Sequence, residues 1–176
     1  DMDEGRSEFF RMAWNLNELT TDEAHWIWLT DTGMDEMLHN SYGASAAFSI
    51  GLYYRLYFTV TLCNFFLEQI QRAEVRFIRA LQYYYIMDLY GNAAFTEEVS
   101  SELAERYTRT QYFDYIEKEL KECEADMAEP GQNTYGRVDK VAAWNLLARL
   151  YLNAEVYTGT AQWQNAMDYA EKVINN

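Results

Sequence analysis

The stretch AEVRFIRALQYYYIMDLYGNAAF, from Ala73 to Phe95, decides the fold of this chain. Its apolar residues cover more than one side of a helix, which indicates a central, buried helix rather than one at the surface. Gly91 tolerates the left-handed conformation that commonly ends a helix, so we expect the helix to stop there and a connection to run to Tyr107. The residues expected to form its buried core are Phe77, Ala80, Leu81 and Tyr84.

Apolar spacing predicts two more helices before this stretch. Residues 7–19 carry one apolar stripe, with Ser7 as the expected cap. Residues 48–70 are almost continuously apolar, so this helix should be buried on most of its sides. Turn-forming residues between the two helices favour a long connection with a short helix at 34–38. The stripe of the first helix consists of Phe9, Met12, Ala13, Leu16 and Leu19.

Further helices are predicted after Tyr107. Thr108 and Gln111 have the spacing of a capping box, and the helix that they begin should end at Pro130-Gly131. Asp139 can cap the next helix, and Thr160 the last one. Apolar residues at intervals of three and four mark the buried sides of the first and the last of these helices. They are Phe113, Ile116, Leu120, Cys123 and Met127, and then Trp163, Ala166, Met167, Ala170, Val173 and Ile174.

Internal repetition supports an array of helical hairpins. Three residues return at one constant offset, namely Ala80, Tyr83 and Gly91 as Ala148, Tyr151 and Gly159. Four expected core residues have the spacing that is typical of the first helix of a tetratricopeptide repeat. They are Trp144, Leu147, Ala148 and Tyr151. Because hairpins of this kind must stack to bury both faces, we predict an all-α fold. It is a tetratricopeptide-like helical hairpin array with long irregular loops, in one domain over residues 1–176.

The formal net charge of −14 in 176 residues excludes several classes of partner. Nucleic-acid binding depends on Lys and Arg at the phosphates, so no nucleic-acid partner is expected. An acidic surface also disfavours direct adsorption to anionic lipid, so any membrane attachment should come from a lipid anchor outside this sequence. The aromatic content of 16% exceeds what a small core needs, and aromatic rings also form surfaces on which sugars and extended peptides stack.

The candidate ligand-binding segment lies between the first two helices. Trp26 and Trp28 are separated by one residue, so in an extended chain both rings point the same way. They would then offer a stacking surface beside the polar groups of His25 and Asp31. The alternative is that both rings simply cover the helix array. Two further expected ligand-binding residues of this segment are Asn40 and Tyr42.

The sequence contains no pattern that indicates catalysis or a bound metal. His25 and His39 are the only histidines, and no further zinc ligands accompany them. The oxygen-rich run at 31–36 lacks the spacing of an EF-hand loop. Phosphate loops, nucleophile elbows and Cys-His arrangements are also missing, so we expect neither an enzyme nor a cofactor. Cys63 and Cys123 lie on apolar helix faces, which favours buried free thiols over a disulfide.

The stretch that begins at Ala73 resembles the signature helix of the SusD/RagB family, outer-membrane nutrient-binding lipoproteins that cap a TonB-dependent transporter. Residues 134–174 resemble the helix pair that follows in that family, and ELTTDEA, from Glu18 to Ala24, resembles its early segment. The matching positions of the signature helix are Ala73, Glu74, Arg76, Phe77, Arg79, Ala80, Tyr83, Tyr84, Leu89, Tyr90 and Gly91.

This resemblance implies a non-catalytic protein of the outer membrane surface that binds glycans, or less often peptides. It implies delivery of the ligand to a SusC-like transporter, with the lipid anchor and the C-terminal half of the family outside this sequence. It also implies that the segment after Ala24 contributes to the ligand-facing surface. The alternative from another class is a tetratricopeptide-like adaptor that binds a protein segment in its concave groove.

Overall fold

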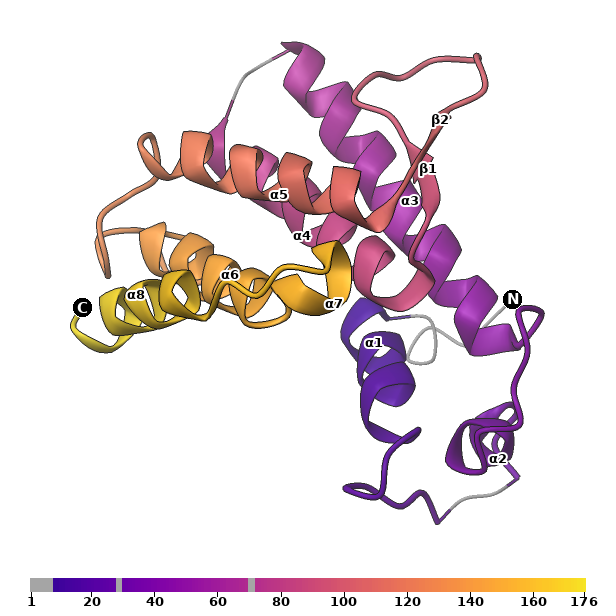
Figure 1. Cartoon of the computed structure of the whole chain (residues 1–176). Coiled ribbons are helices and arrows are strands. Elements are labelled where there is room, and N and C mark those ends of the chain that lie inside the picture. The colour runs from indigo at the N-terminus through magenta and orange to yellow at the C-terminus, as the bar shows by residue number, and fades with distance from the viewer. Residues whose placement is uncertain (1–7, 28–29, 70–71) are drawn as a thin grey trace. The chain divides into compact units, whose positions relative to one another are not determined.

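The computed structural model describes residues 8–27, 30–69 and 72–176, and Figure 1 draws its helices and strands. The chain forms two compact units, residues 1–58 and 59–176. The first unit contains α1 (Phe9–Glu18), α2 (Met34–Leu38) and the first half of α3 (Ala47–Gln69). The second contains the rest of α3, α4 (Ala73–Tyr90), β1 (Ala93–Phe95), β2 (Glu105–Tyr107), α5 (Arg109–Glu124), α6 (Lys140–Leu152), α7 (Ala154–Thr158) and α8 (Trp163–Ile174).

The predicted all-α fold is confirmed. Apart from β1 and β2, the regular structure of the described residues is helical. The two strands pair antiparallel, with Ala94 opposite Arg106, and were not expected from the sequence. In the second unit α4 packs against α5, and α6 packs against α8, as an array of paired helices requires.

The core of the second unit is built around α4, which contacts α5 and α6. On α4, Phe77, Ala80 and Tyr84 are buried and Leu81 is partly buried. The helix ends at Gly91, whose φ of 74° lies in the left-handed region. A Cβ at this position would lie 3.2 Å from Arg109 Nε, so both the conformation and the space favour glycine.

The core residues expected in the later hairpin lie on α6. Trp144, Leu147 and Tyr151 are buried there, whereas Ala148 is partly buried. Further along the unit, the two cysteines have the predicted state, because Cys63 and Cys123 are both buried and free.

Several helix ends follow the predicted chemistry. Thr108 and Gln111 form the expected capping box at the start of α5. The side chain of Asp139 accepts a hydrogen bond from the Val141 amide at the start of α6. The short helix expected at 34–38 is α2. Ser7, the expected cap of α1, lies outside the described residues.

Two other ends were predicted wrongly. α5 ends at Glu124, six residues before Pro130, because tight turns replace the helix there. The Asp126 amide donates to the Cys123 carbonyl, and the Met127 amide donates to the Glu124 carbonyl. α8 begins at Trp163 with Gln162 at its cap position and no side-chain cap. Thr160 is not the cap, since it lies in a turn where its amide bonds to the Thr158 hydroxyl.

The apolar surfaces of α3 and α8 differ from prediction. α3 was expected to be buried on most sides, yet four large apolar side chains at helical spacing are exposed: Tyr54, Phe58, Leu62 and Phe65. On α8 only Ala166 of the predicted stripe is buried, and Trp163, Met167 and Ile174 are exposed. The reason is that α8 contacts α6 on one side only. Among the described residues, no helix is both long and apolar enough to cross a membrane.

Candidate functional site

The segment between α1 and α3, which the sequence suggested for ligand binding, contacts Arg11 of α1 and is tied to itself by one hydrogen bond. Arg11 Nη2 lies 3.5 Å from Asp31 Oδ2. The same guanidinium lies 5.9 Å from the centre of the Trp26 ring. Asn40 Nδ2 donates a hydrogen bond of 3.0 Å to the Thr20 carbonyl. These contacts hold a long connection in a defined path.

The six expected ligand-binding residues have different environments. Trp26 and Asp31 are partly buried and meet at Arg11, so the structure brings these two together. His25, Asn40 and Tyr42 are exposed. The sixth residue, Trp28, lies outside the described residues. Trp26 therefore lies against Arg11 of α1, and the role of these six residues in ligand binding stays a prediction.

This segment contains a pocket of about 320 Å³. None of the six expected residues lines the pocket, although its residues Ser41 and Gly43 flank Tyr42. Hydroxyl groups and the Glu36 carboxylate offer hydrogen bonds to a polar ligand there. The full lining is Thr32, Gly33, Glu36, Ser41, Gly43, Ser45, Ala46 and Ala47.

The walls of this pocket follow from a few local constraints. Met34 and Met37 on α2 are fully buried and anchor the short helix. Gly33 precedes α2 with φ of 83°, and a Cβ there would lie 2.9 Å from the Phe48 ring. Glycine is therefore required at this turn. The Ser41 amide bonds to the Glu36 carbonyl at 2.9 Å, which closes the turn after α2.

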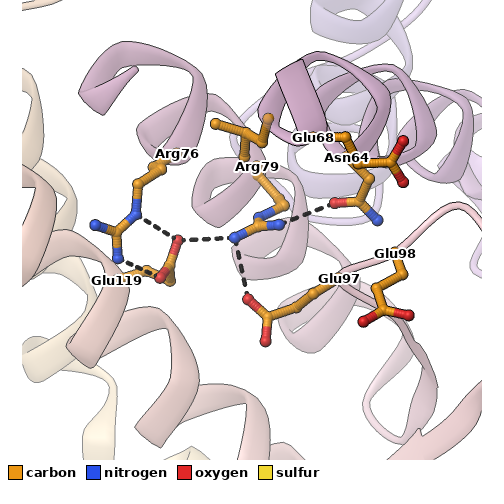
Figure 2. A pocket seen from close by; sticks show the side chains of 8 residues that line it. Asn64, Glu68, Arg76, Arg79, Glu97, Glu98 and Glu119 are labelled. Atoms are coloured by element: carbon orange, nitrogen blue, oxygen red, sulfur yellow. Dashed lines mark hydrogen bonds and ion pairs between the residues drawn. The ribbon is translucent and has the colours of Figure 1, made fainter. Parts of the chain in front are cut away.

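A second pocket, the charged pocket, lies within the second unit and has a volume of about 460 Å³ (Figure 2). Sequence reasoning did not predict it. The end of α3, two turns of α4, one residue of α5 and the loop after β1 supply its walls. The lining residues are Asn64, Leu67, Glu68, Arg76, Arg79, Glu97, Glu98 and Glu119.

Glu119 is the centre of the charge network in this pocket. It accepts hydrogen bonds from Arg76 Nε at 3.2 Å and Arg76 Nη2 at 2.5 Å. Arg79 Nη2 donates at 3.1 Å to Glu119 Oε2, the oxygen that also accepts from Arg76 Nε. Burial alone would raise the pKa of Glu119, but the hydrogen bonds and charges of the two arginines outweigh it, so the pKa is lowered. Glu119 is therefore ionised at neutral pH although only 5% of it is exposed.

Arg79 connects this centre to the rest of the pocket. Its Nη1 donates to Asn64 Oδ1 at 3.0 Å, and its Nη2 also donates to Glu97 Oε1 at 3.1 Å. Asn64 in turn donates to the Thr96 carbonyl at 3.1 Å. Figure 2 shows Arg79 between Glu119 on one side and Asn64 and Glu97 on the other. The guanidinium thus joins three segments that are distant in the sequence.

A sequence signal for the charged pocket did exist. Arg76 and Arg79 are three positions apart, so they share one side of a helix whose other residues are mostly apolar. Glu119 lies between Ile116 and Leu120 beside the apolar stripe of α5. Charges in such positions need buried partners. Among the residues that the structure describes, no group of three or more His, Cys, Asp or Glu side chains is arranged to hold a metal ion.

Comparison with known proteins decides the family. Residues 6–152 match a SusD-like family described as "Starch-binding associating with outer membrane". The chain belongs to the SusD-like family. A relative in Bacteroides thetaiotaomicron, named "Starch-binding protein SusD", is 45% identical over 184 residues, which cover 99% of this chain and 33% of the relative. The chain therefore spans about a third of the length of this curated SusD relative.

Solved SusD structures support the fold. A SusD homologue from Bacteroides thetaiotaomicron matches with a TM-score of 0.79 at 18% identity, over 97% of this chain and 38% of that one. A SusD superfamily protein from Bacteroides vulgatus also gives 0.79, at 16% identity, over 99% of this chain and 39% of the other. A structure described with a xylogluco-oligosaccharide gives 0.74 at 21% identity, over 94% and 38% of the two chains. At these identities the likeness shows the fold alone.

Proposed function

We propose that this chain is the helical part of a non-catalytic SusD-like protein that binds glycans at the cell surface. The observation that carries the proposal is the 45% identity to a starch-binding protein across 99% of the chain. The aligned region includes both compact units and the segment between α1 and α3. Starch and related glucose polymers are therefore the first ligands to test.

The proposed ligand contacts lie in the segment between α1 and α3. Trp26 is partly buried and Tyr42 is 36% exposed, so part of each ring is accessible for stacking on a sugar ring. The neighbouring pocket supplies hydroxyl and carboxylate groups for the sugar hydroxyls. In this proposal His25, Trp28, Asp31 and Asn40 complete the surface. Neutral glycans suit it because the chain has a strong negative net charge.

The proposed partner is a SusC-like TonB-dependent transporter in the outer membrane. Support comes from the family description, which places its members in association with that membrane. A lipid anchor outside residues 1–176 would attach the protein, and the C-terminal half of the family would complete it. The strong negative charge of the chain favours a comparatively basic docking surface on the transporter.

Glycan binding is tested by calorimetric titration with maltoheptaose, and with a xyloglucan oligosaccharide as a second ligand. Replacement of both Trp26 and Trp28 by Ala should weaken binding by about 1–3 kcal/mol, if each ring makes a normal aromatic contact. Trp163→Ala is the matched control, because Trp163 is 61% exposed on α8 in the other unit. Unchanged affinity together with a lower melting temperature in the double variant would assign both rings to the structure.

The transporter is tested by extraction of the full-length protein from native membranes in mild detergent. We expect it to co-purify with a large outer-membrane barrel, because interfaces that survive purification usually bury at least about 1,200 Å². Association should slow as salt rises. Purification without a barrel partner at low and high salt would contradict the transporter proposal and favour a tetratricopeptide-like adaptor.

A further inference from the structure

α3 has one apolar side that is buried and a second apolar side that is exposed. It runs unbroken from Ala47 to Gln69, with formal charges at Arg55 and Glu68 alone (Figure 1). Five apolar residues of α3 are at most 5% exposed, and six large apolar residues, which together form its apolar face, are between 39% and 69% exposed. The buried five are Leu52, Leu56, Val60, Cys63 and Leu67, and the apolar face consists of Ile50, Tyr54, Phe58, Leu62, Phe65 and Phe66.

The apolar face occupies one continuous side of the helix. With 3.6 residues per turn, its six positions fall in a sector of about 160°, and the buried five fall in the opposite sector. Between Ile50 and Phe66, the exposed sector includes two polar residues, Arg55 and Thr61. A helix that borders water normally has charged and polar residues on its outer side. The outer side of α3 therefore has the composition of a contact surface.

The apolar face is large enough for a specific interface. Helices that are apolar on all sides belong to a membrane or to the core of a larger protein. Among the described residues, no helix has the length and hydropathy of a membrane span, and that includes α3. With about 150–250 Å² for each fully exposed aromatic side chain, the exposed fractions of the six amount to roughly 500 Å². A partner that matched this area would bury about 1,000 Å² in total, the size at which specific interfaces begin.

The length of the starch-binding relative indicates what covers the apolar face. This chain aligns with 33% of that relative, so about two-thirds of the relative lies outside the aligned region. Interfaces between proteins that associate reversibly are about as polar as the rest of the surface, whereas permanent interfaces resemble a domain core. The apolar face is of the second kind. It fits a segment of the same polypeptide better than a transporter whose docking surface is basic.

We propose that the apolar face of α3 is an internal packing surface, which the C-terminal part after residue 176 covers in the full-length protein. The covering segment presents apolar side chains to Tyr54, Phe58, Leu62 and Phe65. α3 then becomes a central helix with both sides buried, which is the environment that its sequence predicts. This inference rests on the proposed function, in that a longer SusD-like protein contains this chain, and adds the surface at which the two parts join.

The test is hydroxyl-radical footprinting of the wild-type full-length protein, with mass spectrometry as the readout. The native protein is compared with the same protein in urea, so that each residue supplies its own unfolded reference. Tyr54, Phe58 and Phe65 should be modified at least about tenfold more slowly in the native protein, because covered side chains are inaccessible to the radical. Tyr135 is the internal control, since it is fully exposed in the loop between α5 and α6.

A pair of variants of the full-length protein supplies a second, independent measurement. Replacement of both Phe58 and Phe65 by Ser should lower the melting temperature by at least about 5 °C, because two buried rings are lost from the interface. Tyr135→Ser is the matched control and should melt like the wild type, since its ring is fully exposed. An unchanged melting temperature in the double variant would contradict the packing surface.

The possible outcomes separate this inference from the proposed function. Equal modification of the apolar face in the native and the unfolded protein would overturn the inference, and so would equal protection of Tyr135. Protection that appears only in complex with the transporter, or that disappears on dilution, would assign the face to the transporter or to a second copy and also overturn it. Protection of the face in a full-length protein that binds no glycan in calorimetry would refute the proposed function and support the packing surface.

Discussion

Replacement of Glu119 by Ala should destabilise the protein far more than any other single loss of a carboxylate on α5. Glu119 is 5% exposed and accepts three hydrogen bonds from Arg76 and Arg79. Without it, the hydrogen-bond partners left to Arg79 among the described residues are Asn64 and the half-exposed Glu97, and Arg79 itself is 6% exposed. Breaking a buried ion pair from one side costs about 3–5 kcal/mol, and we expect a loss of that size.

The assay is urea denaturation followed by circular dichroism, with Glu122→Ala as the matched control. Glu122 also pairs with Arg76, but its side chain is 48% exposed, so its loss should cost about 1 kcal/mol or less. The denaturant slope should stay the same in both variants, because neither changes the area exposed on unfolding. Equal losses in the two variants, within about 0.5 kcal/mol, would refute the assignment of Glu119 as the centre of the network.

The same residue predicts how stability depends on pH. The folded-state pKa of Glu119 is lowered below its ordinary value of 4.5. A group of this kind adds stability above its unfolded pKa and loses that contribution as pH falls through the folded value. Stability of the wild type should therefore fall below about pH 4.5, and Glu119→Gln should reduce that fall. An unchanged acid profile in the variant would contradict the charge assignment.

Three further predictions concern folding and the thiols. Ala80→Arg should prevent folding, since Ala80 is fully buried between helices. In thermal circular dichroism the control Asn145→Arg, at an exposed position, should melt like the wild type. Thr108→Ala should cost about 0.5–2 kcal/mol in urea through loss of the capping box, and Thr108→Ser should recover most of it. Burial raises the pKa of Cys63 to about 11 and of Cys123 to about 12. Mass spectrometry should therefore find neither thiol labelled by iodoacetamide at pH 8 until urea is added.

The parts of the fold that depend on local pattern could be predicted from the sequence. The stripe predicted for α5 is an example, because its five apolar residues are all buried, four on α5 and Met127 just after it, and the capping box is present. Helical period, cap chemistry and turn residues act over a few residues, so the sequence displays them directly. The two strands escaped prediction because three residues each are too few for a visible alternation.

What could not be predicted depends on contacts between distant residues. The sequence shows that Phe58 and Trp163 are apolar, but not whether another helix covers them, and both are exposed. The charged pocket depends on pairs such as Arg79 and Glu119, which are 40 residues apart. No local pattern specifies that pairing. The aromatic segment could be identified as unusual, yet the contact of Trp26 with Arg11 appears only in three dimensions.

The shared carboxylate of Glu119 has a consequence for how this sequence can diverge. One residue neutralises two arginines from a different helix, so a neutral replacement is tolerated only if Arg76 and Arg79 change as well. An intermediate sequence that loses Glu119 before its arginines would leave the buried Arg79 without this carboxylate and would be selected against. The three positions should therefore be inherited together among descendants of this protein, while Glu122 beside them varies freely. Among related sequences, this constraint would be visible as replacements at positions 76, 79 and 119 that occur together.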